Sequence, residues 1–147
     1  MIGGARPAVA AALLALCVGC SSSDGRAICG PCPMPVTLSV SGLDQVTAEG
    51  VRMRLCVGEQ PCTSFRLTRR NDLVSCGAVA CSLNETGSPR RLQITLNQTD
   101  ARKVANLPVR VTASTRKGQR QGEATMTYVN WGEPCKCDYS RADVALM

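Results

Sequence analysis

The 147-residue chain contains no histidine. Its absence excludes Ser-His-Asp and Cys-His catalysis, histidine-ligated metals and the commonest general base near neutral pH. The 11 acidic residues are scattered singly, and no two have a spacing that suggests a glycosidase pair. The glycines are isolated turn residues and form no phosphate-binding loop. We therefore expect no catalytic residue, no cofactor and no enzymatic activity.

Aromatic residues are scarce, with one Phe, one Trp and two Tyr. The core must therefore come from Val, Leu, Ile, Met and Ala, which bury less area per residue than aromatic rings do. Disulfides are the natural supplement, and the chain has 10 cysteines. That number is high for a cytosolic protein and ordinary for a secreted one. The composition predicts a secreted domain stabilised by cross-links.

A short apolar run, residues 8–18, lies near the N-terminus. It is too short to span a bilayer and fits the central region of a signal peptide. The following segment, Cys17-Val18-Gly19-Cys20, resembles the lipobox of bacterial lipoproteins. The resemblance implies cleavage before Cys20, diacylglyceryl attachment to its sulfur, and a fatty acyl group such as palmitate or a free amine on its nitrogen. An ordinary signal peptide cleaved nearby is the alternative.

This resemblance divides the chain into three parts. Residues 1–19 form the lipoprotein signal peptide, and residues 20–34 form a lipid-anchored flexible tether that carries the first cysteine pair. Residues 35–147 form one β-sandwich domain. Acyl chains on Cys20 would hold the protein at the extracytoplasmic face of the cell membrane.

Eight cysteines remain for the mature domain, and an even number fits four disulfides with 105 formal connectivities. Two of the pairs we favour are close in sequence, and the other two join the N-terminal cysteines to the C-terminal ones. A four-thiolate zinc site built from the N- and C-terminal cysteines is the alternative, but oxidising surroundings favour disulfides, and we expect no metal. The favoured pairs are Cys56–Cys62, Cys76–Cys81, and Cys29 and Cys32 with Cys135 and Cys137.

The segment Cys29-Gly30-Pro31-Cys32 resembles the active site of thioredoxin. In that family the first cysteine has a lowered pKa because it begins a helix that follows a strand. Here no apolar strand precedes the motif, and Pro33 and Pro35 interrupt any helix after it. We therefore favour structural disulfides, with a thiol-disulfide redox protein using this motif as an alternative function.

Alternating apolar and polar residues predict several short strands separated by turns. Residues 73–83 are predicted as a weak strand or a disulfide-closed loop, and residues 99–106 as one helical turn. The pattern predicts an all-β fold, namely an antiparallel β-sandwich of Ig-like size with seven to eight short strands, stapled by disulfides. The clearer strands are residues 36–41, 51–57, 63–68, 92–97, 109–114, 123–131 and 142–146.

Basic residues cluster in two of the expected loops, residues 69–72 and 116–122. On a sandwich such loops can share one end and meet an anionic envelope polymer or lipid headgroup. A solvated surface is the alternative. Aromatic residues are not interleaved with these charges, so we expect no nucleic-acid partner. The candidate anion-binding residues are Arg69, Arg70, Arg116, Lys117 and Arg120.

One aromatic pair, Trp131 and Tyr139, is a candidate sugar-stacking patch. The alternative is a Trp131 side chain that is buried against the nearby disulfide. Together the features predict a non-catalytic, lipid-anchored envelope protein that acts as a binding or interaction module. A structural accessory subunit that docks to another envelope protein is an alternative. The expected partners are the membrane, through the anchor, and an envelope polymer or envelope protein.

Overall fold

The structure, a computed structural model, describes residues 29–43, 50–86, 90–97 and 99–147. Within these ranges it contains ten strands in two five-stranded sheets and no helix, which confirms the predicted disulfide-stapled β-sandwich. The predicted signal peptide, Cys20 and most of the tether lie outside the described residues. The strand number exceeds the expected seven to eight because two predicted segments each contain two strands.

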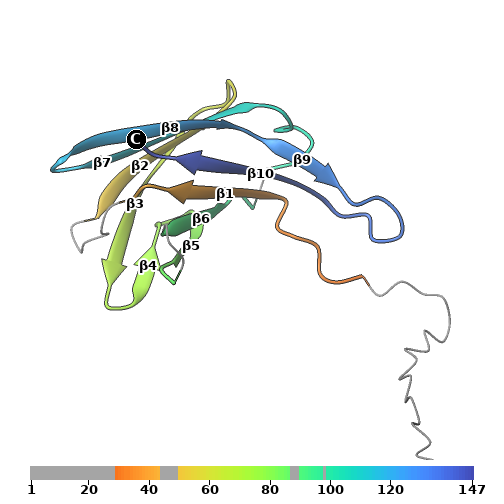
Figure 1. Cartoon of the computed structure of the whole chain (residues 1–147), viewed down its shortest axis with the longest axis horizontal. Helices are drawn as coiled ribbons and strands as arrows, with labels where there is room; N and C mark the ends of the chain where they lie inside the picture. The colour runs from red at the N-terminus through yellow and green to blue at the C-terminus, as the bar shows by residue number, and fades with distance from the viewer. Residues whose placement is uncertain (1–28, 44–49, 87–89, 98) are drawn as a thin grey trace, which may run out of the picture.

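The strands form two layers, and successive groups of strands along the chain belong first to one sheet and then to the other (Figure 1). Sheet 1 has the order β5-β6-β1-β10-β9 and sheet 2 the order β4-β3-β2-β7-β8. The strands of sheet 1 are β5 (Ala80–Asn84), β6 (Arg91–Thr95), β1 (Val36–Ser41), β10 (Asp138–Ala145) and β9 (Thr127–Asn130). The strands of sheet 2 are β4 (Leu73–Ser75), β3 (Thr63–Arg70), β2 (Val51–Val57), β7 (Pro108–Thr115) and β8 (Gly118–Thr125).

The core lies between the sheets and follows the period of two in the sequence. In β2, Val51, Met53 and Leu55 are buried, whereas Arg52 and Arg54 between them are exposed. Successive side chains of a strand point to opposite faces, so the alternation decides which ones enter the core. The buried side chains are almost all aliphatic, as the scarcity of aromatic residues requires.

One strand pair departs from the predicted antiparallel arrangement. β1 and β10 run parallel, with Val36 opposite Ser140 and Val40 opposite Val144, and their arrows point the same way in Figure 1. Parallel neighbours need a long connection, and here the rest of the domain supplies it. β10 also begins at Asp138, four residues before the predicted strand, because its first residues pair with β9.

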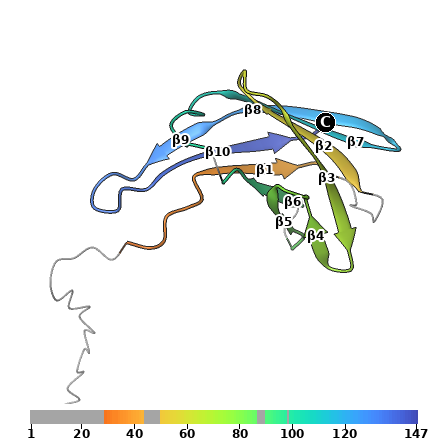
Figure 2. The same cartoon turned by 180° about the vertical axis from the view of Figure 1, so that it is seen from behind.

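The predicted strand over residues 123–131 is divided by Met126 between β8 and β9. The Met126 side chain is fully buried, and its backbone N–H donates to the oxygen of Leu107 at 2.9 Å. At this point the chain passes from sheet 2 to sheet 1, as both views show (Figures 1 and 2). The predicted basic loop over residues 116–122 is wrong, because β8 already begins at Gly118 and only Arg116 and Lys117 connect it to β7.

The connection from β6 to β7 contains turns where one helical turn was predicted for residues 99–106. It is held down by Ala101 and Val104, which are buried. The hydroxyl of the buried Ser140 donates to the backbone oxygen of Ala101 at 2.7 Å. The burial of Ala101 and Val104 and the hydrogen bond from Ser140, rather than helix propensity, determine the conformation of this segment.

All eight predicted cysteines form disulfides, in the favoured pairing. The first two bonds span sequence separations of 106 and 105 residues and the other two span 6 and 5. A link that closes a loop of about 100 residues contributes roughly 4.7 kcal/mol by loop-closure entropy. The bonds are Cys29–Cys135, Cys32–Cys137, Cys56–Cys62 and Cys76–Cys81.

The two edges of the sandwich are closed differently. At one edge the Cys76–Cys81 bond joins the residue after β4 to β5, so it links the two sheets. At the other edge Met147 exchanges backbone hydrogen bonds with Gln121 of β8, at 3.1 and 3.3 Å. Gly122 allows this approach, because a Cβ atom there would lie 2.3 Å from the backbone oxygen of Ala145.

Candidate functional site

Arginines occupy outward positions on neighbouring strands of sheet 2. Arg52 and Arg54 alternate with buried residues on β2, and Arg66 and Arg70 do so on β3. All four side chains are exposed. We call the outward surface of β2, β3, β7 and β8 the cationic face. The same period of two that builds the core therefore gathers positive charge on the other side of the sheet.

The strand register fixes how the arginines lie on this face. Arg52 is directly opposite Arg66 on β3 and Ser114 on β7, and Arg54 is opposite Ser64 and Thr112. Directly opposed residues have Cβ atoms about 5 Å apart. Residues two apart on one strand, such as Arg52 and Arg54, are separated by about 6.7 Å. The side chains of Arg52 and Arg66 therefore start from adjacent positions on neighbouring strands. The side chain of Arg54 starts within one side-chain length of Arg52.

The outward positions around these arginines carry neutral polar side chains. They are hydroxyl groups on β3 and β7 and amides on β8, and each can donate and accept hydrogen bonds. None of the large apolar side chains that are exposed among the described residues lies on β2, β3, β7 or β8. These polar neighbours are Ser64, Thr68, Thr112, Ser114, Gln119 and Gln121.

Glu123 is the only carboxylate within β2, β3, β7 and β8. Arg110 of β7 lies opposite Glu123 of β8 and pairs with it, with 2.5 Å between Nε and Oε1 and both side chains exposed. Among the described residues no carboxylate forms an ion pair with Arg52, Arg54 or Arg70. The face therefore keeps a strong excess of positive charge.

The five arginines and lysines predicted to bind anions do not form one cluster. Arg69 belongs to β3, not to a loop, and its guanidinium turns inward to Glu85, with two hydrogen bonds, and lies near Asp72. Arg120 belongs to β8 and donates to the backbone oxygen of Gly42 at 2.9 Å. These two side chains join elements of the sandwich.

Arg70, Arg116 and Lys117 remain at one end of sheet 2. The register places Ser114 and Arg66 on either side of Arg52, so the β7–β8 turn and the last residues of β3 lie where β2 begins. Arg116 and Lys117 form the β7–β8 turn, whereas Arg70 belongs to the end of β3 and not to the predicted loop over residues 69–72. Sequence reasoning assigned no role to Arg52 and Arg54, although their alternation with apolar residues was the signal.

A hollow of about 280 Å³ lies at the same end of the sandwich. Lys117 and Arg120 line it together with apolar residues that include Leu43 and Leu146. The described residues that line it include no carboxylate.

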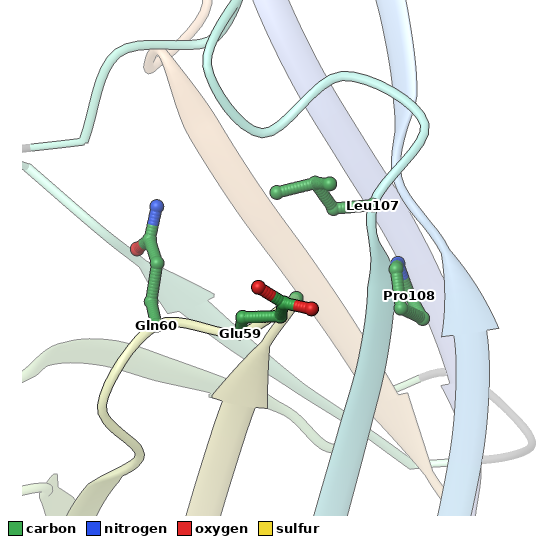
Figure 3. Close-up of a pocket in the computed structure, with 5 residues that line it drawn as sticks. Glu59, Gln60, Leu107 and Pro108 are labelled. Carbon is green, nitrogen blue, oxygen red and sulfur yellow. The ribbon is translucent and has the colours of Figure 1, made fainter.

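A second, open depression lies between the turn after β2 and the start of β7. Figure 3 shows Glu59 and Gln60 on the turn and Leu107 and Pro108 across from them. One carboxylate and one amide face two apolar side chains there. No base, nucleophile or metal-ligand set accompanies the carboxylate among the lining residues.

The aromatic pair lies at the end of sheet 1 where β9 meets β10. Trp131 contacts Tyr139 edge to face, with ring centroids 5.9 Å apart and an interplanar angle of 86°. Trp131 is 49% exposed, so it is not buried against a disulfide as the alternative supposed. One ring face is therefore available to solvent.

Arg102 forms a hydrogen-bonded cluster with Tyr128 of β9 and Asp138 of β10. Arg102 donates from Nε to Asp138 at 2.8 Å and to the Tyr128 hydroxyl at 3.2 Å. The hydrogen bond to Asp138, and then that to Tyr128, raises the pKa of Arg102 above its ordinary value. The guanidinium stays charged and ties the β6–β7 connection to β10.

The cysteines of the thioredoxin-like motif do not pair with each other. Cys29 bonds to Cys135 and Cys32 to Cys137, so neither is a free thiol in this structure. No group of three or more potential metal ligands occurs in the described ranges. Likewise, the described part of the chain has no helix that is both long and apolar enough to span a bilayer.

Comparisons with protein-family models, with curated proteins and with solved structures find no match to this chain.

Proposed function

We propose that this protein is a non-catalytic, lipid-anchored envelope protein that acts as a binding module at the extracytoplasmic face of the cell membrane. The observation that supports a binding role is the cationic face, with four exposed arginines on β2 and β3. Folding requires only that the opposite face of these strands be apolar. Exposed charges of one sign on adjacent strands add nothing to the core and attract anionic partners.

Rigidity suits the same role. The strands that carry the arginines belong to a sheet whose hairpin is closed by Cys56–Cys62. A preformed surface loses little conformational entropy on binding, which leaves more of the contact energy as affinity. The lipid on Cys20 and the tether would keep this surface beside the membrane, in reach of envelope components.

The anchor is tested by the intact mass of the full chain from membranes, before and after reduction and thiol alkylation. We expect a lipid-sized mass on Cys20 and no alkylation until reductant is added. Cys20→Ala should release the protein into the soluble fraction. Labelling of Cys29 or Cys32 without reductant would instead favour the redox alternative.

Binding is tested with the Cys20→Ala chain and purified envelope polysaccharide. We expect co-sedimentation that weakens with added salt, because exposed charges are screened. A salt-insensitive complex with a single envelope protein, and no polysaccharide binding, would indicate the accessory-subunit function instead.

A further inference from the structure

We propose that the cationic face binds a linear acidic polysaccharide, with Arg52 binding one oxyanion and Arg54 the next. This inference rests on the proposed binding function and names its ligand class. The ligand carries carboxylate or phosphate groups along a carbohydrate backbone, and it lies on the open surface of β3, β2 and β7.

Charge complementarity is the first argument. Arg52 and Arg54 project from the same side of β2, about 6.7 Å apart along the strand. Guanidinium groups bind carboxylate or phosphate with two parallel hydrogen bonds, so each of the two can hold one oxyanion of the ligand. Neither arginine forms an ion pair with a carboxylate of the described residues, so both charges attract an anionic ligand.

The neutral side chains of the face give the second argument. Thr112 and Ser114 stand beside the two arginines of β2, and Gln121 and Gln119 continue the same rows on β8. Sugar hydroxyls need groups that both donate and accept, and hydroxyl and amide side chains do so. A row of this kind beside each arginine matches a ligand in which hydroxyl groups alternate with charged groups.

The shape of the face gives the third argument. Arg52 and Arg54 follow each other along β2, and the polar side chains of β7 and β8 flank them on strands spaced about 4.8 Å apart. This arrangement fits an extended chain that runs along β2 and meets the two arginines in turn. It does not enclose a small anion.

Other polyanions and partners fit the face less well. Membrane-surface binding adds apolar side chains that enter the lipid, and single-stranded nucleic acid stacks on aromatic rings. Protein interfaces concentrate their affinity in aromatic and large apolar anchors. All residues of sheet 2 are described, and its one exposed large apolar side chain is Leu73 of the edge strand β4, opposite Arg70 and away from Arg52 and Arg54.

The test measures binding of the full-length protein to polygalacturonate, a linear polymer with one carboxylate on each sugar. Neutral dextran is the uncharged comparison. We expect binding to polygalacturonate only, with an affinity that falls steeply between about 50 mM and about 200 mM salt. Arg52→Glu/Arg54→Glu should lower the affinity by about tenfold or more, because two attractive contacts become repulsive.

The matched control is Arg91→Glu/Arg141→Glu, which makes the same change in net charge on the outward side of sheet 1. Both of these side chains are exposed. We expect it to reduce affinity by less than about threefold, since only long-range attraction is lost. Equal losses in the two variants would show that net charge alone drives binding and would overturn the site.

A second variant separates fork geometry from charge. Arg52→Lys/Arg54→Lys keeps both charges and removes the bidentate fork, and it places no new charge on the sheet. An intermediate loss of affinity supports the gripping geometry, and unchanged affinity contradicts it. This variant also decides the matter if the charge-reversal variant does not fold.

Competing ligands complete the test. Vesicles rich in phosphatidylglycerol and single-stranded DNA are offered in competition with polygalacturonate. Stronger binding to either, lost in Arg52→Glu/Arg54→Glu, would overturn the polysaccharide as ligand but leave the binding module intact. Absence of binding to every polyanion, with retained salt-dependent binding to whole envelope material, would likewise overturn this inference without removing the proposed function.

Discussion

The two sheets bury the same kind of residue and differ in what they turn outward. The outward positions of β1 on sheet 1 are Thr37, Ser39 and Ser41, and those of β10 beside it include one cation and one anion, Arg141 and Asp143. The outward positions of β2 and β3 on sheet 2 include four arginines and no carboxylate. Both sheets contribute buried aliphatic side chains to the core, so the core does not require this difference in outward charge.

The disulfides are also distributed differently between the two sheets. The two long-range bonds end at Cys135 and Cys137, in the connection between β9 and β10 of sheet 1. The chain therefore enters the domain on the side of sheet 1, where a tether would arrive. Sheet 2 has the short Cys56–Cys62 link within its own hairpin, and Cys76–Cys81 joins its edge to sheet 1. Under the proposed function, sheet 1 would serve attachment and sheet 2 would face a ligand.

Removing both long-range disulfides gives the largest expected effect and tests this division. With Cys29, Cys32, Cys135 and Cys137 all changed to Ala, the free energy of unfolding should fall by about 4.7 kcal/mol, because the loop is no longer closed. Changing only Cys29 and Cys135 should cost much less, since the other bond still closes it. Denaturant unfolding measures both. Equal losses from the pairwise and fourfold changes would contradict the shared-loop explanation.

The meeting point of the two sheets gives the next largest effect. Gly122→Ala should lower stability by about 1–3 kcal/mol, because the new methyl group would overlap the backbone of Ala145. Gly30→Ala is the control, since no atom lies within 4 Å of its Cβ position. Thermal unfolding of the two variants should differ clearly. A melting temperature that is unchanged in Gly122→Ala would show that β10 does not pack against β8 in this way.

Much of this fold follows from the sequence because the period of two is strong where strands are half buried. The alternation in residues 51–57 fixed both the strand and its exposed arginines, and the favoured cysteine pairing followed from closeness in sequence and from placement at the two ends of the domain. The parallel pairing of β1 with β10 has no local signal, since it joins segments separated by the whole domain. The break between β8 and β9 at Met126 also has no local signal in the sequence, because the alternation of apolar and polar residues continues through it.

The candidate site shows the same limit. Arg69 and Arg120 were placed in loops, but each lies on a strand with its side chain turned into contacts with other elements. The partner of an arginine depends on its position in the folded structure. No feature of the sequence around Arg69 indicates that Glu85 lies beside it in space. Arg52 and Arg54 were visible as outward residues, but their charge gains meaning only when β3 brings Arg66 opposite.

Glu123→Gln should sharpen the contrast between the faces with a smaller effect. It removes the carboxylate of β8 that pairs with Arg110 and leaves this arginine unpaired. We expect affinity for polygalacturonate to rise about threefold, while stability changes by less than about 1 kcal/mol, as for an exposed ion pair. Asp143→Asn makes the same charge change on sheet 1 and should leave affinity nearly unaltered. An equal rise in both variants would argue against a localised site.

The smallest expected effect is a gain in stability at the centre of the cationic face. Arg52→Gln should raise the free energy of unfolding by about 0.5 kcal/mol, because it removes one of the two like charges at successive outward positions of β2. The same variant should bind polygalacturonate more weakly, so stability and affinity should move in opposite directions. Arg141→Gln, opposite Thr37 on sheet 1, should give no gain. Lower stability in Arg52→Gln would mean that this arginine serves folding, and the argument that the outward charges of sheet 2 exist for a ligand would lose its basis.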